Sequence, residues 1–137
     1  MGDLLDKTTR ALAASADLRS LRQNVVTANI ANAETPGYTA KKLDFEEALG
    51  RALELEGVGD MKTGDQRHYM GGAGSMHNVK ADTYDNPDVN VSNDGNTVDL
   101  EREMSTLAEN SLLYKAAIQL INKKLAQLKY ACGEGGR

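Results

Sequence analysis

A long apolar repeat near the C-terminus constrains the possible folds of this chain most strongly. Its members are separated by alternating steps of four and three residues, with one polar break at Ser111: Leu100, Met104, Leu107, Tyr114, Ile118, Ile121, Leu125 and Leu128. An average period of about 3.5 residues is typical of the contact seam of a coiled coil. Asn96 or Thr97 can cap this helix, acidic residues lie at its start and lysines lie near its end, which suits the dipole of a single helix. The sequence therefore predicts one long helix over residues 98–131, followed by a flexible tail at 132–137.

A second and weaker seam lies near the N-terminus. Leu18, Leu21 and Val25 are spaced by three and four residues, and small alanines occupy several other seam positions. This pattern predicts a helix over residues 1–34, whose narrow apolar stripe needs a packing partner to be stable. Asn32 falls on the next seam position, where a buried Asn would fix the register, unless it simply lies at the helix end. The two stripes can pair with each other as a hairpin, with other subunits, or with both.

The residues that follow the first helix predict a tight turn. Pro36 cannot continue a helix, and it moves Thr35 out of the α region. Pro36 and Gly37 fit the two central positions of a type II turn, in which the glycine supplies a positive φ. Tyr38 begins an extended run and is placed to lay its ring against the helix. Three nearby side-chain amides can bond the backbone of the turn or of a neighbouring chain: Asn24, Asn29 and Asn32.

Residues 35–97 are expected to hold this turn, one short helix and a loop-rich outer region. The short helix is predicted to have Asp44 as its cap and Glu47 as the reciprocal partner. Glycines then interrupt any periodicity, so at most short strands are expected, around Arg67–Met70 and Val89–Val91. The predicted fold is mainly α, with long N- and C-terminal helices pairing as a coiled-coil-like hairpin.

The composition disfavours several classes of function. A formal net charge of −4 offers no basic surface for a nucleic-acid backbone. The single cysteine, Cys132, allows neither an internal disulfide nor a multi-cysteine metal site. No nucleophile lies in a recognisable catalytic motif, and the N-terminus lacks the pattern of a secretory signal peptide. We therefore expect no enzyme activity, no cofactor and no small-molecule substrate.

Three segments have some features of a ligand site, and simpler structures account for each of them. The spacing from Asn90 to Glu101 approaches that of a calcium loop, but its first position is Asn and no amphipathic helix precedes it, so a turn followed by a helix cap is the simpler explanation. His68 and His77 lie in a Gly-rich stretch without cysteines, where exposed loop histidines are common. Residues 71–74 lack the Gly-Lys-Ser/Thr ending of a phosphate loop. No metal-binding residues are therefore predicted.

Two segments resemble a known family. Ala28-Asn29-Ile30-Ala31-Asn32 followed by Thr35-Pro36-Gly37-Tyr38, with Asn24 just before, resembles the N-terminal signature of flagellar rod, hook and hook-associated axial proteins. The family usually has Leu where this chain has Ile30. The segment from Asp94 to Met104, with Leu107-Ala108-Glu109-Asn110 and Tyr114 after it, resembles the start of the C-terminal helix in proximal-rod members. The resemblance covers residues 10–55 and 88–130.

This resemblance implies a structural subunit of the bacterial flagellar basal body. Such subunits are exported by the flagellar type III apparatus without a cleaved signal peptide. In the periplasm they assemble as a helical homo-oligomer, a tube whose terminal helices lie inward and whose middle region faces outward. The partners implied are other flagellar rod proteins, the rod adaptor FliE and the membrane ring. The tube would transmit torque and enclose the export channel.

Two alternatives remain open from the sequence. A closely related type of proximal-rod subunit has a similar length and a similar N-terminal motif. A soluble helical regulator could instead bind a partner helix through the C-terminal seam, although such a protein would need no Thr-Pro-Gly-Tyr turn.

Overall fold

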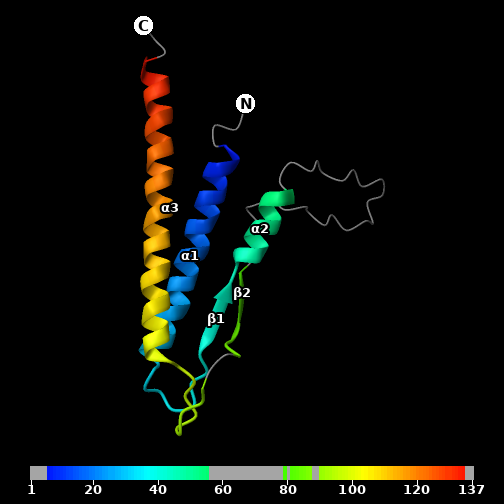
Figure 1. Ribbon diagram of the computed structural model, residues 1–137, viewed down its shortest axis with the longest axis vertical. Helices are drawn as coiled ribbons and strands as arrows, with labels where there is room; N and C mark the ends of the chain where they lie inside the picture. Colours follow the sequence, from blue (N-terminus) through cyan, green and yellow to red (C-terminus); the bar gives the residue numbers. More distant parts are fainter. Residues whose placement is uncertain (1–5, 56–78, 80, 88–89, 135–137) are drawn as a thin grey trace, which may run out of the picture.

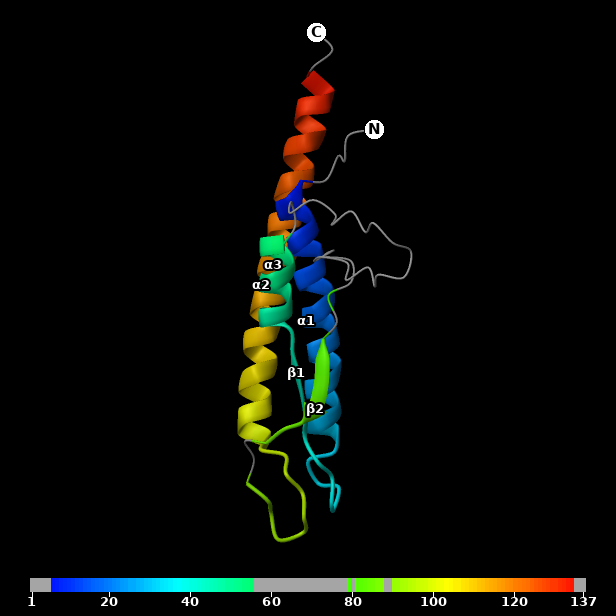
Figure 2. The ribbon, with the colours of Figure 1, turned by 90° about the vertical axis from the view of Figure 1, so that its right-hand side faces the viewer.

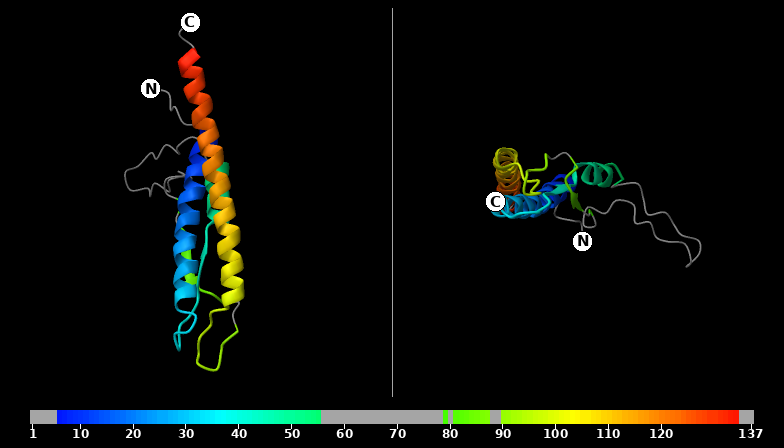
Figure 3. Two further views of the ribbon diagram at one scale, coloured as in Figure 1. Left: turned by 90° about the vertical axis from the view of Figure 1, so that its left-hand side faces the viewer. Right: turned by 90° about the horizontal axis from the view of Figure 1, so that it is seen from below.

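A computed structural model describes residues 6–55, 79, 81–87 and 90–134, and it shows an elongated molecule in three layers (Figure 1). Helix α3 (Leu100–Glu134) forms one outer layer, and α1 (Lys7–Ala31) lies in the middle. The other outer layer holds α2 (Glu46–Leu55) and a ribbon of two strands, β1 (Lys41–Asp44) and β2 (Asp82–Asp85). The view from below in Figure 3 shows the same order. The predicted mainly helical fold, with paired terminal helices and a loop-rich middle, is confirmed.

The two long helices run antiparallel and form a hairpin (Figure 2). At its open end Asp6 caps α1, because its carboxylate accepts a hydrogen bond from the Thr9 backbone N–H at 2.8 Å. The side chain of Lys124 on α3 pairs with the same carboxylate. This pair and the bonds from Thr9 lower the pKa of Asp6 to about 2. Helix α3 has 35 residues against 25 in α1, and it extends past the start of α1.

The start of α3 differs from the sequence prediction. Either Asn96 or Thr97 was expected to cap this helix, but its first residue is Leu100. The carboxylate of Asp99 accepts from the Arg102 backbone N–H at 3.1 Å, so Asp99 is the cap. Asn96 and Thr97 are buried and make other bonds. The expected end also differs, since the helix continues through Cys132 to Glu134.

A small apolar core lies on the face of α1 that is turned away from α3. Leu18, Leu43 and Phe45 are buried in it, and Val25 and Leu49 pack against them. Leu18 and Val25 were predicted to lie in a helix–helix seam, and they pack instead against β1 and the start of α2. The reason is that Leu43 of β1 and Phe45, just before α2, offer bulky apolar surface against which these side chains are buried.

The ribbon was only partly predicted. β1 pairs antiparallel with β2, with Lys41 opposite Asp85 and Lys42 opposite Tyr84. β2 escaped prediction because its four residues, Asp-Thr-Tyr-Asp, are all exposed and give no alternation of apolar and polar side chains. The expected strand at Val89–Val91 is absent from its described residues, 90 and 91, and residues 67–70 lie outside the described part of the chain.

The predicted cap of the short helix is also corrected. Asp44 is the last residue of β1, and α2 begins at Glu46. The Asp44 carboxylate accepts from the Tyr84 hydroxyl and lies 3.4 Å from the Lys42 ammonium, so cross-strand and strand partners hold it. The carbonyl of Phe45 instead accepts the first helical bond, from the Leu49 N–H at 2.8 Å.

Candidate functional site

The closed end of the hairpin is built on the turn that the sequence predicted. Gly37 has a φ of 72°, and the Tyr38 N–H donates to the Thr35 carbonyl at 3.3 Å. Both observations agree with a type II turn. Asn32, the C-cap of α1, donates through Nδ2 to the Ala28 carbonyl at 2.8 Å. It therefore closes the helix end and is not the buried register-fixing residue of a seam.

Asn29 anchors the extended run that follows the turn. Its side chain is fully buried, Nδ2 donates to the Lys41 carbonyl at 2.7 Å, and Oδ1 accepts from the Lys41 N–H at 3.0 Å. The amide thus pairs with Lys41 as a neighbouring strand would. The Tyr38 hydroxyl donates to the same Oδ1 at 3.2 Å, as expected for a ring laid against α1. Burial raises the pKa of Glu103 on α3, and a hydrogen bond with Asn29 offsets part of this effect.

A loop that precedes α3 docks onto the turn. Asn96 is 2% exposed, and its Nδ2 lies within hydrogen-bond distance of three carbonyls, those of Asn32 at 2.9 Å, Ala33 at 3.0 Å and Thr35 at 2.8 Å. Its Oδ1 accepts from the Val98 N–H at 2.7 Å. One side chain therefore satisfies the free carbonyls at the end of α1 and also shapes the entry to α3.

Two glycines allow this close approach. Gly95 has a φ of 79°, a conformation that L side chains rarely adopt. A Cβ on Gly95 would lie 3.5 Å from the Cα of Gly37, and the Gly37 N–H donates to the Asp94 carbonyl at 3.0 Å. The backbones of the turn and the loop are therefore in direct contact.

Thr97 completes the contact between these segments. Its N–H donates to the Tyr38 carbonyl at 3.0 Å, and its hydroxyl accepts from the buried Ala40 N–H at 2.8 Å. We call this unit, residues 29–41 with 92–97, the clasp. The two segments that resemble flagellar axial proteins are thus joined in space as one structure.

The remaining residues of the N-terminal motif lie on the surface. Five of them are exposed: Asn24, Ala28, Ala31, Thr35 and Pro36. The expectation that the Asn amides bond the backbone of the turn is not met within the chain: Asn29 bonds the backbone of Lys41 and Asn32 bonds the Ala28 carbonyl of α1. The exposed members are the ones available to a neighbouring chain.

The predicted seam on α3 is partly covered by α1. Its middle members are half-buried: Leu107, Tyr114, Ile118 and Ile121. Its end members are exposed, by 45% at Leu100, 57% at Met104, 46% at Leu125 and 36% at Leu128. A strict seven-residue repeat drifts by about 20° per heptad around a straight α-helix, so one partner helix cannot cover all of it. On α1, Leu21 is also exposed, by 50%.

Asn110 occupies the centre of the contact between α1 and α3, which sequence reasoning did not identify. It is 2% exposed, and its Nδ2 donates to the Arg19 carbonyl at 2.8 Å. Its Oδ1 is buried and accepts no hydrogen bond from the part of the chain that the structure describes. The sequence showed one polar position in the repeat, Ser111, and the buried polar side chain belongs to the residue before it, Asn110.

Arg22 ties the third layer to α1 and was also missed. Its guanidinium lies 4.4 Å from the centre of the Phe45 ring, and Nε donates to the Leu43 carbonyl at 2.9 Å. The two terminal nitrogens donate to the two carboxylate oxygens of Glu46 at 2.5 and 2.6 Å. Burial acts to raise the pKa of Glu46, but the bonds from Arg22 outweigh it and lower this pKa to about 2.

Within the described ranges no three His, Cys, Asp or Glu side chains gather in a way that could hold a metal ion. No helix among these residues is both long and apolar enough to cross a bilayer. In the segment compared with a calcium loop, the Gly95 N–H donates to the Ser92 carbonyl at 2.9 Å, which forms a turn. His68, His77 and residues 71–74 lie outside the described part of the chain.

The chain matches known proteins over most of its length. The family model described as flagella basal body rod protein matches residues 10–39. The flagellar basal body rod protein FlgB of Cereibacter sphaeroides is 39% identical over 114 residues, covering 83% of this chain and 84% of the relative. FlgB of Salmonella typhimurium is 37% identical over 133 residues, with coverages of 91% and 92%. FlgB of Proteus mirabilis is 32% identical over 139 residues, with coverages of 98% and 100%.

Proposed function

This chain belongs to the FlgB family of flagellar basal body rod proteins, and we propose that it is a structural subunit of the proximal rod that polymerises through its terminal helices. The resulting tube would transmit torque and enclose the export channel. The similarity to proteins named FlgB decides between FlgB and its close relative FlgC, the two rod types that the sequence left open. These relatives are named as rod proteins, which supports the expectation that this chain catalyses no reaction.

The observation that carries the proposal is the incomplete coverage of the long helices. Apolar side chains remain exposed at both ends of the α3 seam, notably Leu100, Met104 and Leu125. Burial of these exposed apolar residues, which we call the apolar band, against other subunits would stabilise an assembly by about 25 cal/mol for each Å² removed from water. The clasp holds α1 and α3 together, so that the band is presented by a defined hairpin.

We assign the parts of the chain accordingly. Residues 1–34 and 98–131 would form the inner core of the tube, and residues 35–97 its outer region. The rod adaptor FliE, other rod proteins and the membrane ring are the proposed partners. The proposed location is the periplasmic part of the basal body, reached by export without a cleaved signal peptide.

Deletion of the gene in its host tests this proposal directly. We expect loss of rod, hook and filament above an intact membrane ring in electron cryotomograms, restored by the wild-type copy. Cells that still swim on complete flagella would refute the rod function and favour a helical regulator.

Substitutions at Ile118 test the role of the seam. Ile118→Leu keeps the half-buried position apolar, and we expect normal swimming. Ile118→Asp places a charge in the seam and should abolish rod assembly. Circular dichroism of the purified variants, which must show equal helix content, separates failed assembly from failed folding. Normal rods built from folded Ile118→Asp protein would contradict the proposed seam.

A further inference from the structure

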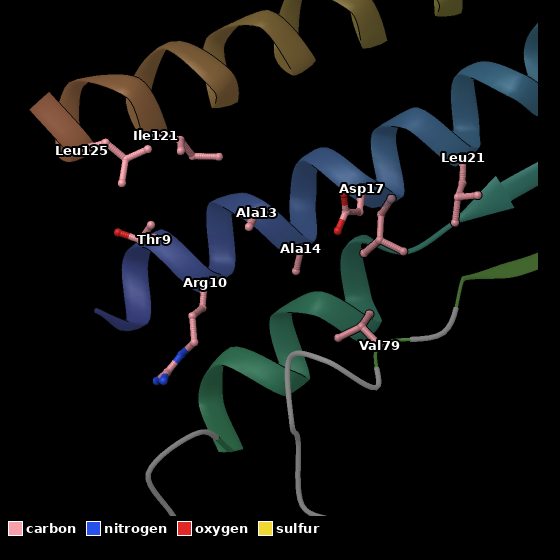
Figure 4. A pocket seen from close by; sticks show the side chains of 10 residues that line it. Thr9, Arg10, Ala13, Ala14, Asp17, Leu21, Val79, Ile121 and Leu125 are labelled. Atoms are coloured by element: carbon pink, nitrogen blue, oxygen red, sulfur yellow. The ribbon is translucent and has the colours of Figure 1, made fainter. Parts of the chain in front are cut away.

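An apolar groove runs along the side of α1 that neither α3 nor the ribbon covers (Figure 4). Helix α1 forms its floor, α3 forms one wall, and Val79 lies on the other side. Its volume is about 520 Å³. The floor is low because Ala13 and Ala14 lie there, so a helix laid in the groove could approach α1 closely. Leu21, Ile121 and Leu125 supply larger apolar surfaces to its sides.

A matching apolar ridge lies on the other flank of α3. Leu112, Ala116 and Leu120 are spaced by four residues and therefore form one row along the helix, with Leu113 beside them. Leu112 is 68% exposed, Leu113 39% and Leu120 51%. These bulky apolar side chains leave much of their surface exposed in the described structure.

The groove and the ridge lie on opposite sides of the contact between α1 and α3. Asn110 and Ala117, which are buried against α1, separate the two flanks. Because an α-helix turns by about 100° per residue, Leu120 and Ile121 diverge to either side of Ala117. The α3 helix that carries the ridge is also a wall of the groove, so a chain cannot place its ridge in its own groove.

The two features lie at the same height on the hairpin. Asn110 bonds Arg19, and Lys124 bonds Asp6, so antiparallel partners have residue numbers that add to about 130. On this scale Ala116 is level with Ala13. The ridge can therefore enter the groove of a molecule that stands beside it, with little shift along the axis.

We propose that the α3 ridge of one copy docks in the α1 groove of the next copy. The proposal rests on the polymeric function above and deepens it by naming the lateral contact. The occupant is a second copy because the groove is continuous with the proposed seam through Ile121 and Leu125, and because the chain itself carries a ridge of matching height. Two different patches meet in this contact, so each copy binds one neighbour on each side and the arrangement propagates around an axis.

Cysteine cross-linking in assembled rods tests this contact. The starting chain carries Cys132→Ser, which removes the exposed native thiol. The test variant adds Ala13→Cys and Ala116→Cys, two exposed positions at the same height in the groove and on the ridge. The matched control pairs Ala13→Cys with Lys115→Cys, which is also exposed and points about 100° away around the helix. Each variant is co-expressed with the Cys132→Ser chain so that rods form.

Basal bodies are isolated, oxidised and analysed on non-reducing gels. We expect a disulfide-linked dimer of the test variant and loss of that dimer in the control, because a disulfide cannot form between cysteines whose Cβ atoms point away from each other. The absence of dimer in intact rods, or equal dimer from both variants, would overturn the docking and leave the rod function standing. A product joining Ala13→Cys to a different rod protein would also overturn it. Complete rods in cells that lack every copy would instead defeat the rod function.

Discussion

Replacement of Asn96 by Ala should destabilise the hairpin more than any other single truncation in the clasp. The side chain has only two amide hydrogens for the three carbonyls within its reach, and its oxygen accepts one further bond. We therefore count about three net hydrogen bonds. At about 0.5–1.5 kcal/mol for each bond, the variant should lose about 2–4 kcal/mol of unfolding free energy.

Urea unfolding of the purified chain, followed by far-UV circular dichroism, measures this loss. With a dependence of about 1–3 kcal/mol per molar urea, the midpoint should fall by about 1–2 M. Asn93→Ala, at an exposed position of the same loop, is the matched control and should leave the midpoint unchanged. Asn96→Asp keeps an acceptor for the Val98 N–H and removes both donated hydrogens. Its urea midpoint should therefore also lie below that of the Asn93→Ala control. An Asn96→Ala midpoint equal to that of the control would refute the clasp.

Two further predictions follow from the polar contacts of α1 and α3. The pKa of Glu46 is about 2 in the folded chain, below the usual glutamate value of 4.5, so the stabilisation from Arg22 is present above pH 4.5 and disappears as the pH falls towards 2. Because the Glu46 side chain is 55% exposed, we expect this stabilisation to amount to only about 1 kcal/mol. Glu46→Gln should remove this pH dependence in urea unfolding. Asn110→Leu should raise the urea midpoint, because it removes a buried amide oxygen without a partner in the described part of the chain, and a lowered midpoint would show that the bond to Arg19 outweighs this cost.

The features that sequence reasoning found are those set by neighbours along the chain. The spacing of apolar residues is a property of one helix, so α1 and α3 could be recognised from it. The turn depends on Pro36 and Gly37 themselves, and the positive φ expected at Gly37 is observed. The two segments with a family resemblance were also visible as strings of residues.

The features that sequence reasoning missed depend on residues far apart. Asn96 reaches carbonyls that lie more than sixty positions earlier, and nothing in its immediate sequence distinguishes this role from that of a helix cap. Asn110 contacts Arg19 across 91 positions. Strand β2 was missed because its residues gain order from pairing with β1, while their own side chains stay exposed. Long-range contacts of this kind leave no periodic signal.

The structure also changes how the N-terminal motif is understood. Asn29, Asn32, Gly37 and Tyr38 bond within the chain, where they close the hairpin against the loop before α3. The hydrogen-bonding groups named here are therefore already paired within the single chain. The stripe of α1 that carries Leu18 is likewise used internally, against β1 and the start of α2. What remains for other subunits is the surface of α3 on either side of its contact with α1, together with the open side of α1. One end of the hairpin is thus closed by contacts within the chain, while the longest helix keeps apolar surface exposed. A self-assembling subunit requires both, a stable fold of its own and free surface for its neighbours.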